Sequence, residues 1–90
     1  MVKKIRAIIY DIKDGKPYEN QGVATNVSDG GTITHGLTRT PNYGYAICTV
    51  AGEFASITAF DSTTMTVAIK KHDGSPGTTQ TIYWFAGYKP

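Results

Sequence analysis

Residues 64–70, Thr-Met-Thr-Val-Ala-Ile-Lys, indicate the class of fold that this chain adopts. Met65, Val67 and Ile69 alternate with threonine, alanine and lysine. Because successive side chains of a β-strand point to opposite faces, the segment presents one apolar face and one polar face. We therefore predict a strand with one side on a hydrophobic core and the other side facing outward.

Runs of similar length fill the chain on both sides of this segment. Threonine, valine, isoleucine and tyrosine are abundant, whereas Leu37 is the sole leucine. Turn sequences rich in Asp, Gly, Pro and Ser recur between the runs. This pattern predicts an all-β chain, a small antiparallel β-sandwich that is jelly-roll-like, with a small barrel as the alternative. The expected strands cover residues 23–27, 32–37, 43–50, 54–60, 64–70 and 79–88.

The alternation also predicts which side chains share a face. Ile33, His35 and Leu37 fall on one side of their strand. Residues 43–50 are apolar on both sides, which indicates a central strand covered on both faces. The loop 72–78 is expected to be a hairpin tip. On residues 23–27, Val23 and Val27 share one face and Ala24 and Asn26 the other. On residues 54–60, Ala55, Ile57 and Ala59 share one face and Phe54 and Phe60 the other. On residues 79–88, Ile82, Trp84 and Ala86 share one face and Tyr83 and Phe85 the other.

The chain length suffices for a single domain, which we place over residues 1–90. In its N-terminal part, residues 1–22, apolar residues recur at helical spacing, but the β-branched residues and the Asp14-Gly15 turn favour a strand. A chain this short has a marginal core. Cys48 has no partner for a disulfide, so association with further copies is the expected source of additional burial.

Charge and motif content argue against several classes of function. The net charge of +2 is small and the basic residues are scattered, so nucleic acid is not an expected partner. No apolar run has the length needed to cross a bilayer, so membrane insertion is not expected. The acidic residues mostly stand at turns, where they cap amides. We predict no catalytic residues, no metal site and no cofactor, and we interpret Cys48 as a small apolar side chain.

Aromatic side chains gather near the end of the chain and on one further strand. If they are exposed, these rings could stack on sugars. The alternative, which we favour, is that the inward half fills the core and the outward half fills a subunit interface. The cluster comprises Tyr83, Trp84, Phe85 and Tyr88, together with Tyr43 and Tyr45.

Four short motifs occur in an order that resembles small β-modules of bacteriophage tail fibres and related virion surface proteins. They are Gly-Thr-Ile-Thr-His-Gly-Leu at 31–37, Thr-Pro at 40–41, Thr-Met-Thr-Val at 64–67 and Ile-Tyr-Trp-Phe-Ala at 82–86. The resemblance extends over about residues 23–88 and departs at Thr38-Arg39, where such proteins more often have glycine. It implies a β-sandwich that assembles as a homotrimer and serves attachment or assembly without chemistry.

His35 lies at the end of the first motif. We expect it to be partly buried and to bond loop backbone groups through its ring nitrogens. Gly36 would then make a sharp turn and Pro41 would fix the start of the next strand. The alternatives are a contact to a glycan and, at lower weight, a metal on a three-fold axis held by one His35 from each chain.

The leading hypothesis is a viral structural protein: a tail-fibre, spike, turret or capsid-decoration module that is assembled in the host cytoplasm and mediates host attachment from the virion surface. Its partners would be further copies of itself, other virion proteins and a host glycan. The second hypothesis is a stand-alone carbohydrate-binding module, oligomeric so that weak sites gain avidity. A third is an accessory domain of an enzyme. The candidate recognition residues are His35, Gly36, Pro41, Tyr43, Tyr45, Trp84 and Tyr88.

Overall fold

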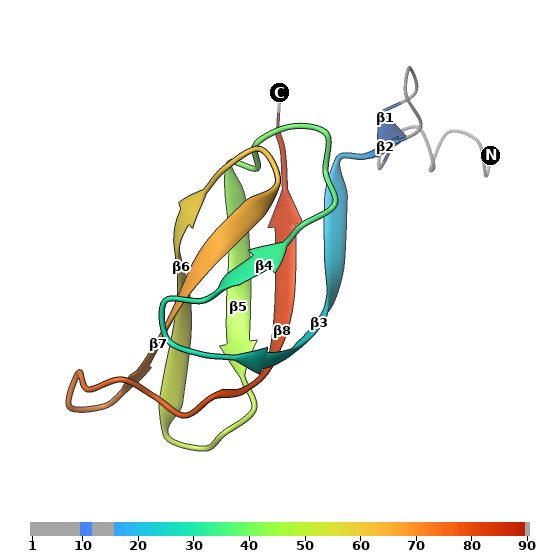
Figure 1. Cartoon of the computed structure of the whole chain (residues 1–90). Coiled ribbons are helices and arrows are strands. Elements are labelled where there is room, and N and C mark those ends of the chain that lie inside the picture. Colours follow the sequence, from blue (N-terminus) through green and yellow to red (C-terminus); the bar gives the residue numbers. More distant parts are fainter. Residues whose placement is uncertain (1–9, 12–15, 90) are drawn as a thin grey trace.

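The protein is an all-β structure, shown here as a computed structural model that describes residues 10–11 and 16–89 (Figure 1). The turn expected at Asp14-Gly15 and the first nine residues lie outside this part of the chain. Tyr10–Asp11 pairs antiparallel with Lys16–Pro17, in accord with the extended structure favoured there. The strands are β1 (Tyr10–Asp11), β2 (Lys16–Pro17), β3 (Glu19–Val27), β4 (Thr32–Thr34), β5 (Tyr43–Cys48), β6 (Glu53–Phe60), β7 (Thr64–Lys71) and β8 (Gln80–Gly87).

Two antiparallel three-stranded sheets pack face to face in the described chain, with strand orders β3-β8-β5 and β4-β7-β6. From β3 onward, consecutive strands lie in different sheets, except for β6 and β7, which form a hairpin (Figure 1). β8 pairs with β5 on one side and with β3 on the other. In the second sheet, β7 pairs with β6 on one side and with β4 on the other. This is the winding of a jelly roll, here with three strands per sheet where a full jelly roll has four. The predicted jelly-roll-like sandwich is confirmed.

The two central strands, β7 and β8, supply most of the core. Met65, Val67 and Ile69 have no exposed surface, as their alternation predicts. Ile82 and Ala86 of β8 are equally buried and face them from the other sheet. The predicted apolar face of β7 is therefore confirmed as the inward one, and the predicted grouping of Ile82, Trp84 and Ala86 on one face of β8 is confirmed, because strict alternation survives wherever a strand has no bulge.

Bulges overturn the predicted faces of β3 and β6. The register of β3 shifts between Ala24 and Val27, where Asn26 adopts a left-handed conformation with a φ of 56°. The extra residue moves Val27 into the core while Val23 stays outside, so the prediction that both valines share a face is wrong. A second shift, between Ile57 and Ala59, leaves Ala59 exposed and brings Phe60 against the core.

The prediction of a central strand at residues 43–50 is also wrong. Among the described residues, β5 pairs only with β8 and so forms an edge of its sheet, and Tyr45 and Ile47 project outward. β8 occupies the centre instead. The loop at residues 72–78 connects β7 and β8, which belong to different sheets (Figure 1), but it first doubles back on the end of β7. Lys70 forms an antiparallel bridge with Pro76, and the Lys71 amide donates to the Ser75 carbonyl at 2.9 Å, so the predicted hairpin tip is present.

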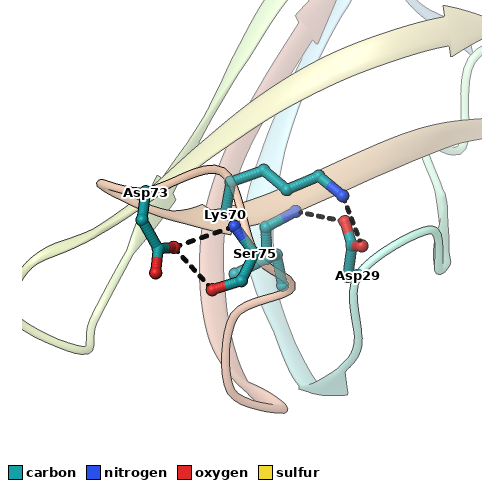
Figure 2. A network of polar contacts seen from close by, with 5 residues as sticks. Asp29, Lys70, Asp73 and Ser75 are labelled. Atoms are coloured by element: carbon teal, nitrogen blue, oxygen red, sulfur yellow. Dashed lines mark hydrogen bonds and ion pairs between the residues drawn. The ribbon is translucent and has the colours of Figure 1, made fainter.

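Carboxylates hold the loops in place, as Figure 2 shows for Asp29 and Asp73. Asp29 accepts hydrogen bonds from the Ile69 amide at 2.9 Å and from Lys70 Nζ at 2.8 Å, which ties the β3–β4 turn to β7. Asp73 accepts from the amide and the hydroxyl of Ser75 within its own loop. The Lys70 hydrogen bond and the Ile69 amide lower the pKa of Asp29, and the Ser75 groups lower that of Asp73.

Two further acidic side chains close the ends of the sandwich. Asp61 accepts hydrogen bonds from the Thr64 and Thr63 amides, which lower its pKa to about 2. Glu53 accepts from the Thr78 amide and from Gln80 Nε2, and so joins the start of β6 to the chain that leads into β8. The predicted role of aspartates as turn caps is confirmed for Asp61 and Asp73, whereas Asp29 bonds a strand amide.

Candidate interaction surface

His35 is fully buried at the end of β4, with 0% of its surface exposed. The Leu37 amide donates to Nδ1 at 3.0 Å. Because Nδ1 accepts, the proton of the neutral ring is on Nε2, which donates to the Asp61 carbonyl at 2.9 Å. The predicted bonds to loop backbone are thus present, and the burial is more complete than expected. Both nitrogens are engaged within the chain, so neither is available to a metal or a glycan in this arrangement.

The residues after His35 complete the same corner. Gly36 has a φ of 72°, which is the left-handed region that favours glycine, so the predicted sharp turn is present. Asn20 of β3 donates from its side-chain amide to the His35 carbonyl at 2.8 Å. Pro41 is buried just before β5. His35, Gly36 and Pro41 therefore build the corner that joins the two sheets.

Trp84, predicted as a candidate recognition residue, faces the core and is only 8% exposed. Its indole lies against the backbone of Gly22 on β3, where an added Cβ would come within 3.0 Å of the ring. A ring in this position cannot serve as an exposed stacking platform. The correction follows from strand alternation: Trp84 shares the inward face of β8 with Ile82 and Ala86.

The exposed large side chains gather instead on the outer face of the β3-β8-β5 sheet. One row across the sheet consists of Val23, Tyr83 and Ile47, and the next consists of Gln21, Phe85 and Tyr45. We call these six residues the aromatic face; none of them carries a charge. Val23, Tyr83, Ile47 and Tyr45 are 57%, 50%, 53% and 53% exposed. Of the sequence-based candidates, Tyr45 belongs to this face, and its ring stacks on Phe85 with centroids 5.4 Å apart.

Tyr43 borders the aromatic face in a third row, opposite Gly87, which in turn is opposite Glu19. Its ring crosses over Gly87, where a Cβ would overlap it, and its hydroxyl donates to the Glu19 carboxylate. That hydrogen bond, with burial and the charge of Glu19, raises the pKa of Tyr43 to about 12. Tyr43 therefore links β5 to β3 across the central strand β8.

Tyr88, the last sequence-based candidate, lies beyond the end of β8. The Arg39 guanidinium is 5.4 Å from the centroids of both the Tyr88 and the Tyr18 ring, an arrangement that suits cation–π attraction. The Tyr88 amide donates to the Tyr18 carbonyl. Arg39, in the segment where the sequence departs from the resemblance, thus holds the loop between β4 and β5 against one end of this sheet, where β3 begins and β8 ends.

The described residues show no cluster of three or more His, Cys, Asp or Glu side chains that could hold a metal ion. Cys48 is partly buried against the core, and burial raises the pKa of its thiol. Among the same residues, no helix has the length and apolar character that crossing a membrane requires.

Sequence reasoning missed half of the aromatic face: Gln21, Val23 and Ile47. The strands of Val23 and Ile47 were predicted, whereas Gln21 precedes the predicted strand 23–27 and belongs to β3, which begins at Glu19. The pairing that places all three around Tyr83 and Phe85 was not predicted. Comparison of the chain with protein-family models, curated proteins and solved structures gave no match.

Proposed function

We propose that the protein is a structural module of a virion surface, a tail fibre, spike, turret or decoration unit, which works by assembly into a homotrimer and by attachment. The proposal is supported by the four motifs, which resemble phage tail-fibre modules, and by the sandwich fold in which they stand. Residues 31–37 and 40–41 form the corner around His35, and residues 64–67 and 82–86 form the centres of the two sheets.

The observation that carries the proposal is the uncharged, apolar aromatic face. A small domain without a disulfide gains stability when neighbours cover such a face, and an uncovered one promotes aggregation. At the loops, the carboxylates of Asp29, Glu53, Asp61 and Asp73 accept hydrogen bonds from backbone amides. A rigid module with one apolar side is suited to assembly.

Multi-angle light scattering across micromolar concentrations tests this function. We expect a particle with three times the mass of one chain. A monomer at all concentrations up to about 100 µM would overturn the proposal, since a structural module must hold its assembly at working concentration. Neighbouring genes that encode capsid or tail proteins would support the virion assignment independently.

A carbohydrate-binding module is the second candidate, because one hollow beside the aromatic face combines an aromatic ring with polar groups. Glu19, Asn20, Gln21 and Phe85 line about 240 Å³ there. A sugar could stack on Phe85 while its hydroxyls bond the polar side chains. A glycan array with the wild-type chain and Phe85→Ala tests this function; Trp84→Ala is unsuitable, since it opens the core.

A further inference from the structure

We infer that the aromatic face is the surface through which this chain binds a second copy of itself. The inference rests on the proposed assembly and goes further by naming the surface that the copies share. It also states that the opposite sheet remains outside the contact.

The aromatic face supplies a large part of the apolar surface that a specific interface between proteins needs. Half-exposed tyrosines contribute roughly 100 Å² each, and Val23 and Ile47 somewhat less, so the four side chains offer on the order of 350 Å² of surface. A standard interface takes about 800 Å² from each partner, a little over half of it apolar. Gln21, Phe85 and the flanking Thr49 and Thr81 supply a surrounding rim of partly polar surface.

The chemistry of the face favours a copy of this chain over other occupants. It carries no positive charge for nucleic acid or an anionic lipid surface, and no negative charge for a basic partner. A face without charge brings no like-charge repulsion where the same faces of several copies meet, as they would around the axis of the proposed trimer. Its central hollow, about 310 Å³ lined by Val23, Tyr45, Ile47 and Tyr83 among others, is open and shallow, which suits an inserted side chain better than an enclosed small molecule.

The apolar surface continues around the edge of the sheet. β5 is an edge strand without a charge or a proline, the devices that commonly protect such edges. A further hollow of about 470 Å³ lies between β5 and β6 and is lined by Tyr43, Ile57 and Phe60 among others. The opposite outer face differs: its exposed positions on β4 and β7 are Thr32, Thr34, Lys70 and Lys71, and Phe54 is the one large exposed apolar side chain identified on the described part of that sheet.

Two matched variants test the inference. Ile47→Arg places a charge in the aromatic face, and Phe54→Arg places the same charge at a 63% exposed apolar site on the other sheet. In sedimentation velocity we expect Ile47→Arg to raise the concentration at which half the chains are assembled by at least about 100-fold, because like charges meet across the contact. Phe54→Arg should assemble as the wild type does. Val23→Lys, on another strand of the same face, should repeat the effect if Ile47→Arg does not fold.

The outcomes separate the inference from the proposed function. Wild-type chains that assemble, together with face variants that assemble equally well, would overturn the inference and leave the proposed function standing. Wild-type chains that remain monomeric would overturn both. Unchanged assembly combined with loss of glycan binding in Ile47→Arg would also overturn the inference and assign the face to a sugar.

Discussion

Replacing His35 with alanine tests whether the imidazole holds the corner between the sheets. The change leaves the buried Leu37 amide without its acceptor at Nδ1 and the Asp61 carbonyl without its donor at Nε2. An unpaired buried amide costs about 1–2 kcal/mol, and the cavity left by a fully buried ring adds about 2–3 kcal/mol. The Asp61 carbonyl adds little, since its loop is exposed and water can replace the lost donor. We therefore expect His35→Ala to lower the free energy of unfolding by about 3–5 kcal/mol, much of the stability of a small domain.

Urea unfolding followed by the fluorescence of Trp84, the single tryptophan, measures this change, because the buried indole becomes exposed on unfolding. All variants are compared at one protein concentration, since assembly adds to apparent stability. His72→Ala is the matched control: His72 is exposed in the β7–β8 loop, and its loss should change the free energy by less than about 0.5 kcal/mol. A His35→Ala variant within about 1 kcal/mol of the wild type would refute the architectural role.

Two further predictions concern a carboxylate and a close backbone approach. The pKa of Asp61 is lowered from its ordinary value of 3.8 to about 2 by the Thr64 and Thr63 amides, so the stability that it contributes is present above about pH 4 and is lost as the pH falls toward 2. Asp61→Asn should flatten the decrease of Tm between pH 4 and pH 2, and an unchanged slope would contradict this. Gly87→Ala should cost about 1–3 kcal/mol in urea unfolding, because the new Cβ overlaps the Tyr43 ring. The cost should shrink in a Tyr43→Ala background; an equal cost in both backgrounds would show that the ring is not responsible.

The inward faces of the central strands could be predicted from the sequence because each depends on local alternation alone. Met65, Val67 and Ile69, like Ile82 and Ala86, are buried as their spacing predicts. That the His35 ring bonds to loop backbone groups could also be predicted from the sequence. His35 shares a face with the apolar residues Ile33 and Leu37 and precedes a glycine. A polar ring in such a place must find partners in the nearby backbone when it is buried.

The alternation could not predict which strands stand at the edges. Residues 43–50 are apolar on both faces, and a buried central strand has that pattern. An edge strand with an exposed apolar outer face shows the same pattern. In the folded chain β5 is an edge strand, and Tyr45 and Ile47 remain half exposed. The apolar pattern of one strand cannot separate these cases because it does not record which other strands pair with it.

Sequence alone therefore determined that this chain is all-β, which side chains share a face on its central strands, and that His35 belongs to a corner, since all three follow from short-range spacing. Only the tertiary structure decided where the apolar side chains come together. Val23, Tyr83 and Ile47 are far apart in the sequence, and the pairing of β3 and β5 on either side of β8 brings them into one row. The bulge at Asn26 keeps Val23 outside while Val27 enters the core, because a single added residue reverses the face of everything beyond it.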